Sequence, residues 1–292
     1  MPPGVSANAT TLAILAPGLL GGSVARAARA RGAATRIVIW ARRPETREAL
    51  RGQPWVDSIA STPAEAVRAA SLVVIAAPVD RIVPLARAIA PDLRPGTLVT
   101  DVGSVKGVIC QAAAEAVGPA AHFVGSHPMA GSEKTGWEHG TAELFAGRPC
   151  FVTPLADSPP WAVGAVTAFW RALGAEVVTT TPTEHDRIVA HISHLPQVAA
   201  SALCAFLAGR DARWRDHAGG GLRDTTRIAG SDPELWKVIL AANRTEVLAA
   251  LRGYQAELGR AADALAAGED DQVAALLEKG RAYRAGLRVP SP

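Results

Sequence analysis

Cysteine, aromatic residues and long apolar runs are all scarce in this sequence. Only three of its 292 residues are cysteines, and the odd number and wide spacing of Cys110, Cys150 and Cys204 argue against a disulfide framework or a zinc knuckle. We therefore expect a reducing, cytoplasmic setting. No apolar run approaches the roughly 20 residues that a membrane helix needs. No basic segment precedes the apolar stretch at residues 12–22, which argues against a signal peptide.

Concentrated positive charge is also missing. The 30 lysines and arginines are balanced by 27 aspartates and glutamates and are spread along the chain. No block of basic residues is present, and aromatic residues that could stack on bases make up only 5% of the chain, so we expect no nucleic-acid partner. Hydrophobic residues at 49% and charged residues at 20% are typical of a globular chain.

The first half of the chain alternates apolar runs with helical patterns. The runs lie at residues 12–16, 36–40, 72–77, 97–102 and 122–125. They are continuous rather than alternating, which indicates strands of a parallel sheet covered on both faces. We therefore predict an α/β fold with a Rossmann-like, doubly wound sheet. Two further runs, at residues 150–153 and 175–181, flank a helix predicted at residues 162–173, and we expect them to extend the same sheet.

After Pro182 the apolar residues change to helical spacing. The pattern covers residues 184–207 and 235–265, and a last helix is predicted near residues 271–284. We therefore predict a dinucleotide-binding Rossmann domain at residues 1–182 and an all-helical substrate and dimerisation domain at residues 183–292. A long apolar helix without a sheet to cover it favours packing against a second copy, so we expect a homodimer formed through the helical domain.

A glycine-rich turn follows the first predicted strand and opens a helix. It contains Gly18, Leu19, Leu20 and Gly21, and it fits the dinucleotide-binding fingerprint in which backbone N–H groups at a helix N-terminus hold a pyrophosphate. The first glycine of the fingerprint is replaced by Ala16. Taken alone, the pattern is also compatible with a tight strand–helix turn that binds nothing.

The residues after the second predicted strand bear on the choice of cofactor. NAD enzymes usually place an acidic residue there to bind the ribose 2′-hydroxyl, whereas this chain has Arg42 and Arg43. Arginine suits bidentate contact with a phosphate, so we predict NADP as the preferred cofactor and NAD as the alternative. Two surface arginines in a loop are the other interpretation. We assign Ala77 and Pro78, at the end of the third run, to the same cofactor site.

Two polar segments follow the next predicted strands, where ligands bind in such sheets. The first contains Ser104, and the second contains His127 before a proline in a glycine-flanked loop. An unperturbed histidine titrates near neutrality, so His127 could accept a proton from an alcohol as hydride leaves. Ser104 could orient the same hydroxyl group.

Polar residues are also dense in the helical half, which suggests one wall of a cleft. Arg227 could hold a substrate carboxylate, although a surface pair with Asp224 is the alternative. His191 and His194 are spaced three residues apart, but no carboxylate accompanies them at ligand spacing, so we expect no metal site. We interpret His191 as a structural residue that makes capping or interhelical hydrogen bonds.

Five segments together resemble the prephenate/arogenate dehydrogenase family. They are GLLGGS at residues 18–23, DVGSVK at 101–106, SHPMAGSEKTG at 126–136, SHLPQ at 193–197 and GLRDTTRIAGSDPELW at 221–236. Their order agrees with the family, and two of them are specific to it: the His-Pro-Met-Ala-Gly motif within residues 126–136 and the Arg-Asp-x-Thr-Arg-Ile-Ala motif within residues 221–236. The resemblance implies an N-terminal Rossmann domain, a helical dimer-forming domain and a substrate site between them.

The resemblance also implies a reaction and a role for each matching residue. The chain would convert prephenate to 4-hydroxyphenylpyruvate by oxidative decarboxylation in tyrosine biosynthesis, with hydride transfer to a nicotinamide cofactor. His127 would take the proton of the ring hydroxyl, Ser104 would contact that hydroxyl and the nicotinamide, and Arg227 would hold the ring carboxylate. The positions that match residues shaping or gating the cleft are Glu133, His185, Asp186, Asp224 and Trp236.

Gln197 departs from the family pattern. Prephenate-specific members often carry a second histidine there, near the substrate side chain. A neutral amide can accept a hydrogen bond from the ammonium group of arogenate as well as donate one to a carboxylate. Conversion of arogenate to tyrosine, or activity on both substrates, is therefore the main alternative.

Two other classes of protein could share the predicted fold. A β-hydroxyacid dehydrogenase would need a catalytic lysine in its helical domain, but neither Lys237 nor Lys279 lies in a suitable motif, and a pyrroline-carboxylate reductase is equally remote. A non-catalytic dinucleotide-binding regulator would be expected to lose His127, Ser104 or Arg227, and all three are present.

Overall fold

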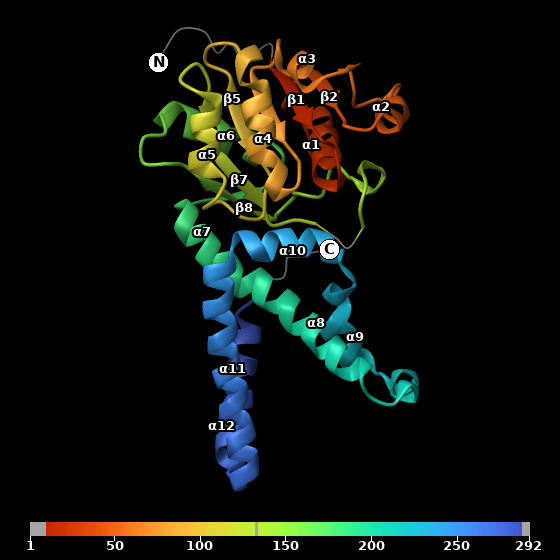
Figure 1. The fold of residues 1–292 in the computed structure, drawn as a ribbon, viewed down its shortest axis with the longest axis vertical. Coiled ribbons are helices and arrows are strands. Elements are labelled where there is room, and N and C mark those ends of the chain that lie inside the picture. The colour runs from red at the N-terminus through yellow and green to blue at the C-terminus, as the bar shows by residue number, and fades with distance from the viewer. Residues whose placement is uncertain (1–9, 132–133, 288–292) are drawn as a thin grey trace.

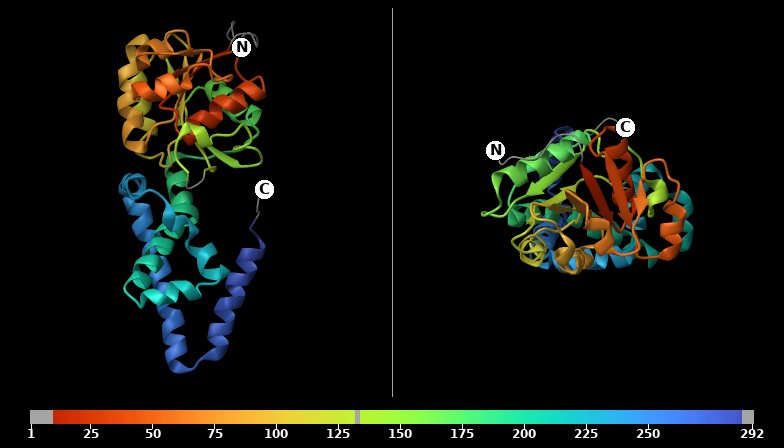
Figure 2. Two further views of the ribbon diagram at one scale, coloured as in Figure 1. Left: turned by 90° about the vertical axis from the view of Figure 1, so that its right-hand side faces the viewer. Right: turned by 90° about the horizontal axis from the view of Figure 1, so that it is seen from above.

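The computed structural model describes residues 10–131 and 134–287, which form an α/β part followed by a helical part (Figure 1). Seen from the side, the helical part extends away from the sheet and ends in the hairpin of α11 (Arg244–Ala267) and α12 (Asp270–Ala285) (Figure 2). The predicted fold class, a Rossmann-like sheet followed by helices, is confirmed.

A six-stranded parallel sheet is the centre of the α/β part. Its spatial order is β3-β2-β1-β4-β5-β6, so the order reverses between β1 and β4, where ligands bind in sheets of this kind. The strands are β1 (Thr11–Leu15), β2 (Arg36–Trp40), β3 (Ser58–Ile59), β4 (Leu72–Ile75), β5 (Leu98–Asp101) and β6 (His122–Phe123). The connecting helices are α1 (Leu19–Ala30), α2 (Pro44–Leu50), α3 (Pro63–Val67), α4 (Val79–Ile89), the short η1 (Ala90–Asp92) and α5 (Cys110–Val117).

Both faces of this sheet are buried, as the continuous apolar runs predict. Along β1, Leu12 and Ile14 enter one core cluster, whereas Ala13 and Leu15 enter another on the opposite face. Successive side chains of a strand point to opposite faces, so a strand covered on both sides must be apolar throughout.

A second, three-stranded sheet replaces the predicted extension of the first. It contains β7 (Gly125–Pro128), β8 (Pro149–Thr153) and β9 (Glu176–Thr179), with β7 antiparallel and β9 parallel to β8. The prediction that residues 150–153 and 175–181 extend the main sheet is therefore wrong. Helix α6 (Pro160–Ala172) packs against β8 and β9, whereas the short η2 (Trp137–His139) packs against α1.

Side-chain hydrogen bonds mark the point where the chain leaves the first sheet for the second. Where the ladder between β5 and β6 ends, Thr100 Oγ1 donates to Val124 O at 2.7 Å, and Ser126 N donates to Asp101 Oδ1 at 3.0 Å. These polar side chains take the place of backbone pairing and direct the chain out of the parallel sheet.

The helical part begins with a nearly continuous helix. Its segments are α7 (Pro182–Val189), the π-helical turn η3 (Ala190–His194) and α8 (Leu195–Ala208). Pro196 has no N–H and its ring would clash with a regular preceding turn, which accounts for the wide turn at this point. The remaining helices are η4 (Ala212–His217), α9 (Gly220–Thr226), η5 (Arg227–Gly230), α10 (Pro233–Ala242), α11 and α12.

The two parts are packed against each other. Helix α10 contacts α4, and its buried Ile239 belongs to a core cluster of the α/β part (Figure 1). By length and composition alone the stretch Pro182–Ala208 could cross a membrane, which we did not expect from the sequence. Within it, however, His185, Asp186 and His194 are buried polar residues, and its first segment, α7, contacts β8 of the α/β part.

Candidate active site

The glycine-rich turn lies at the carboxyl end of β1, next to β4. Gly18 is the N-cap of α1, no side chain caps this helix, and its first turn contains no acidic residue. A Cβ atom on Gly18 would have nothing within 4 Å, whereas a Cβ on Gly21 would lie 2.8 Å from Ala76 Cβ. Gly21 thus permits close packing of α1, and Gly18 leaves open space beside uncapped N–H groups. This arrangement fits a dinucleotide pyrophosphate.

Ala16 has an unusual backbone conformation. Its φ is 60°, and among the described residues it is the only non-glycine with a positive φ. Ala16 N donates to Trp40 O at 2.9 Å, which ties the turn to β2. The left-handed region costs a residue with a Cβ atom roughly 1–2 kcal/mol. The chain therefore keeps the geometry of the fingerprint without its first glycine, at a cost in stability.

Arg42 and Arg43 follow β2 and are both exposed. Among the described carboxylates, none forms an ion pair with either guanidinium. Arg47 supports their loop, because its Nη1 donates to Ala41 O at 2.8 Å and to Arg42 O at 3.2 Å. Pro78 is the N-cap of α4 beyond the end of β4. Since β4 is the neighbour of β1, Pro78 and the glycine turn lie at the same edge of the sheet.

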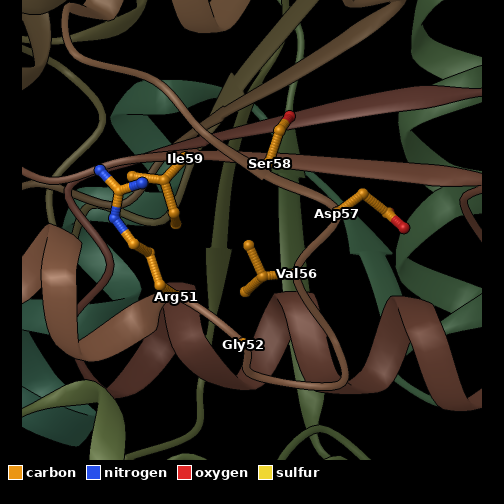
Figure 3. Close-up of a pocket in the computed structure, with 6 residues that line it drawn as sticks. All are labelled: Arg51, Gly52, Val56, Asp57, Ser58 and Ile59. Atoms are coloured by element: carbon orange, nitrogen blue, oxygen red, sulfur yellow. The ribbon is translucent and has the colours of Figure 1, made fainter.

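A shallow hollow lies elsewhere, at the outer edge of the sheet between α2 and β3 (Figure 3). It is lined by Arg51, Gly52, Val56, Asp57, Ser58 and Ile59. Asp57 Oδ2 is already occupied, since it accepts a hydrogen bond from Ile37 N at 2.6 Å and pairs with Arg29. None of the residues predicted for the site lines this hollow, and we assign it no role.

A fully buried ion pair holds the end of β5. The side chains of Asp101 and Lys106 are both 0% exposed and are in contact. Lys106 Nζ also donates to Ser126 O at 2.9 Å, and Asp101 Oδ2 accepts from Gly103 N at 2.8 Å. These bonds fix the loop that carries the half-buried Ser104 against β7. Sequence reasoning did not single out this pair, although a lysine between apolar residues after a strand was a recognisable indication.

His127 lies in strand β7 and is only 7% exposed. The prediction that it lies in a loop is wrong, because the segment pairs with β8 as far as Pro128. Burial, the neighbouring His185 and the charge of Lys106 lower the pKa of His127 well below its usual 6.5. The imidazole is therefore neutral near pH 7.

His127 contacts two residues of α7. Its Nδ1 lies 2.9 Å from Nε2 of His185, and Nδ1 of His185 lies 2.8 Å from Oδ1 of Asp186. Asp186 also accepts hydrogen bonds from the backbone: Lys106 N donates to Oδ1 at 2.7 Å and Gly107 N to Oδ2 at 2.8 Å. The helical part is thereby joined to both His127 and the loop of Ser104.

Further polar residues lie along the same helices. His194 is 1% exposed, its Nδ1 lies 3.2 Å from Asn243 Nδ2, and its ring makes an edge contact with Trp236. Its buried Nε2 has no hydrogen-bond partner among the described residues, and burial lowers its pKa to about 4. Gln197 is also buried, with Nε2 3.4 Å from Ser201 Oγ. Sequence reasoning did not select His194 or Asn243 for the site.

The other predicted residues lie in less enclosed positions. Arg227 begins η5, Asp224 lies in α9, and both are exposed. No ion pair joins these two described residues, so the alternative of an Asp224–Arg227 pair is not observed. Glu133 lies outside the described residues. His191 is exposed, and its Nδ1 bonds to Arg187 O of its own helix at 2.8 Å.

Family models match both parts of the chain. The nucleotide-binding domain of prephenate dehydrogenase matches residues 24–179, and the dimerization domain of prephenate dehydrogenase matches residues 181–279. Together the two matches cover most of the chain, and they confirm the resemblance inferred from the five motifs.

Individual relatives agree with these matches. A cyclohexadienyl dehydrogenase of Zymomonas mobilis is 31% identical over 95% of this chain and 96% of its own length. A prephenate dehydrogenase of Bacillus subtilis is 31% identical over 82% of this chain, which spans 65% of that protein.

Solved structures show the same relationship. The prephenate dehydrogenase from A. aeolicus in complex with hydroxyphenyl propionate and NAD+ superposes with a TM-score of 0.88 at 27% identity, over 94% of this chain and 97% of that chain. Synechocystis arogenate dehydrogenase gives a TM-score of 0.82 at 27% identity, over 94% of this chain and 99% of that chain.

Proposed function

The chain belongs to the prephenate dehydrogenase family, and from this membership we propose that it converts prephenate to 4-hydroxyphenylpyruvate and carbon dioxide with a nicotinamide cofactor, in tyrosine biosynthesis. The observation that carries the proposal is His127, a buried neutral imidazole beside the carboxyl edge of a nucleotide-binding sheet. A neutral imidazole can accept the proton of a ring hydroxyl, which an imidazolium cannot.

The chain's own residues divide the chemistry between them. When bound, the oxidised nicotinamide supplies the hydride acceptor for C4 of the substrate. His127 takes the C4 hydroxyl proton, and Ser104 orients that hydroxyl from the loop after β5. As C4 becomes a carbonyl carbon, the bond from C1 to the ring carboxylate breaks and its electron pair makes the ring aromatic. His127 then returns its proton to the ring oxygen, which completes the phenol.

Substrate contacts come from the helical part in this proposal. The Arg227 guanidinium is suited to hold a substrate carboxylate through two parallel hydrogen bonds. In this proposal Gln197 meets the substrate side chain, whereas Trp236 and Asp224 shape the cleft, and the resemblance assigns Glu133 to the same role. The edge contact between His194 and Trp236 supports a fixed position for the indole.

Gln197 favours a second candidate substrate, arogenate. Its buried carboxamide carries both a donor and an acceptor, so it can meet either the keto acid of prephenate or the ammonium of arogenate. The Zymomonas mobilis relative named a cyclohexadienyl dehydrogenase supports activity on both ring compounds.

We propose NADP as the preferred cofactor. The residues that would hold it are Gly18, Leu19, Leu20 and Gly21 at the pyrophosphate, and Ala77, Pro78 and Ser104 toward the nicotinamide. Arg42 and Arg43 would bind the 2′-phosphate, and their exposure without carboxylate partners among the described residues supports this.

We also propose a homodimer formed through residues 183–292, with the domain boundary at residues 182 and 183. Large apolar side chains are exposed along the helices of this part: Phe206, Leu258, Leu265 and Leu277 are 58%, 54%, 65% and 68% exposed. A second copy would cover such a surface. A reducing, cytoplasmic setting is consistent with the free thiols, and burial raises the pKa of Cys110 to about 11.

One set of rates tests the proposed function. Absorbance at 340 nm is followed with prephenate and with arogenate, each in the presence of NADP and of NAD. We expect turnover of prephenate with NADP. The rate with arogenate tests whether arogenate is a substrate as well. Absence of turnover in all four combinations would refute the proposed reaction.

A further inference from the structure

We propose that Asp186 and His185 fix the tautomer of His127, placing its ring proton on Nδ1 and leaving Nε2 as the proton acceptor. The inference rests on the proposed function for its catalytic consequence, but its proton arrangement stands on geometry alone. It makes His185 and Asp186 positioning residues of the helical part, rather than residues that contact the substrate.

The arrangement starts at Asp186, whose carboxylate accepts hydrogen bonds from backbone N–H groups at both oxygens. Lys106 N donates to Oδ1 at 2.7 Å and Gly107 N donates to Oδ2 at 2.8 Å. Backbone N–H groups are obligatory donors, so the carboxylate must act as the acceptor toward each of them. Toward His185 Nδ1, 2.8 Å from Oδ1, it is again the acceptor, which places a proton on that nitrogen.

The proton on Nδ1 of His185 determines the direction of the hydrogen bond between His185 and His127. A neutral imidazole carries only one ring proton, so Nε2 of His185 is left with a lone pair. That atom lies 2.9 Å from Nδ1 of His127. The His127 Nδ1 must therefore donate, and the remaining nitrogen of His127, Nε2, keeps its own lone pair. In the described part of the chain this Nε2 makes no hydrogen bond.

A charged alternative is disfavoured by the surroundings. If either imidazole carried two protons, the added charge would lie in a region that is almost closed to water. His185 is 0% exposed and His127 is 7% exposed, and the Lys106 ammonium is a common neighbour. Asp186 is one negative charge, and it is already held by three donors. Two neutral rings with a defined direction of donation are the stable arrangement.

The same bonds connect the orientation of His127 to the docking of α7. The N–H groups that hold Asp186 belong to the loop that carries Ser104, and a Cβ atom on Gly107 would lie only 2.8 Å from Asp186 Oδ2. Correct placement of α7 on this loop therefore sets the tautomer of His127 and its distance to Ser104 together. Glycine at position 107 allows the close approach.

Asp186→Asn is the variant that should reverse the direction of donation in these hydrogen bonds. A carboxamide has only one oxygen to meet the three donors, so its NH2 group faces His185 or one backbone N–H. With the NH2 group on His185 Nδ1, the direction of donation inverts and the proton of His127 moves to Nε2. We expect kcat to fall on the order of 10²–10⁴-fold, as when a triad carboxylate that sets a histidine tautomer becomes an amide. The KM for the cofactor should be unchanged.

Variants at position 185 separate this role from general support. His185→Gln can place Oε1 where Nε2 was and should retain kcat within about tenfold, whereas His185→Leu removes the acceptor and should lose about 100-fold or more. His191→Gln is the matched control: this exposed histidine bonds to its own helix, and its replacement should leave kcat unchanged. Equal activity of the Leu and wild-type proteins would overturn the proposal.

The closing experiment reads the tautomer directly. The full chain labelled with 15N-histidine is measured at pH 8 by long-range 1H–15N correlation, with His127 assigned from His127→Asn. We expect the proton of His127 on Nδ1, and on Nε2 in Asp186→Asn. A wild-type proton on Nε2 would overturn the inference, even if Asp186→Asn does not fold. Should the predicted tautomer be found without turnover of prephenate or arogenate, the proposed reaction fails while the proton arrangement stands.

Discussion

The buried ion pair between Asp101 and Lys106 predicts a large loss of stability in Lys106→Met. Methionine keeps most of the side-chain volume but removes the ammonium, so Asp101 remains as a buried carboxylate without its counter-charge, and Ser126 O loses the donor at 2.9 Å. Breaking a buried pair by removing one partner costs about 3–5 kcal/mol. At about 2–4 °C per kcal/mol for a domain of this size, the midpoint of thermal unfolding should fall by roughly 6–20 °C.

Urea and thermal denaturation at pH 7.5 measure this effect. The matched control is Lys237→Met: Lys237 pairs with Glu234 at 3.2 Å on the surface, and its loss should change the free energy of unfolding by less than about 0.5 kcal/mol. The double variant Asp101→Asn with Lys106→Met should regain part of the loss, because no uncompensated charge stays buried. A cost below about 1 kcal/mol for Lys106→Met would refute the reasoning.

Three further predictions follow from the site. Ala16→Gly should raise the free energy of unfolding by about 1 kcal/mol in urea denaturation, because glycine adopts a φ of 60° without strain; a decrease would contradict it. Since burial holds the pKa of His127 well below 6.5, kcat/KM should stay level from pH 8 to 6.5 and fall only at lower pH. A pH profile of kcat/KM with its midpoint at or above 6.5 would contradict this prediction, because His127 would then be protonated near neutral pH. Replacing Arg42 and Arg43 with Ala should raise KM for NADP about tenfold or more and leave KM for NAD within about twofold; equal effects on both would exclude 2′-phosphate binding.

The parallel sheet could be predicted from the sequence because a strand that is buried on both faces must be apolar at consecutive positions. The runs at β1, β2 and β4 are apolar in consecutive positions, and only a strand covered on both sides requires that. Strand β3 has two residues, Ser58 and Ile59, which is too short to produce a pattern.

The second sheet could not be predicted in the same way. An apolar run at residues 150–153 has the same appearance whether it pairs with the edge strand β6 or with β7. The choice depends on hydrogen bonds that join Thr100 to Val124 and Asp101 to Ser126, more than 20 residues further along the chain, and periodicity contains no information about such contacts. His127 was misplaced for a related reason: a glycine and a proline nearby are typical of loops, whereas pairing with β8 makes the segment a strand.

The residues of the site were predictable as types but not as an arrangement. The motifs indicated His127, Ser104 and the acidic and basic residues of the helical part. The link from Asp186 through His185 to His127 depends on the docking of α7 against the β5–α5 loop, which no local pattern describes. The buried Nε2 of His194, which has no partner in the part of the chain that the structure describes, likewise becomes visible only once the helices are packed.

The rate of His127→Asn tests the central claim most directly. Initial rates with prephenate and NADP at pH 8 give kcat/KM for this variant and for the wild-type chain. Loss of the proton acceptor should lower kcat/KM by 10²–10⁴-fold, or on the order of 3 kcal/mol or more of transition-state stabilisation. A folded variant whose kcat/KM lies within about threefold of wild type would remove His127 from the reaction and contradict the account.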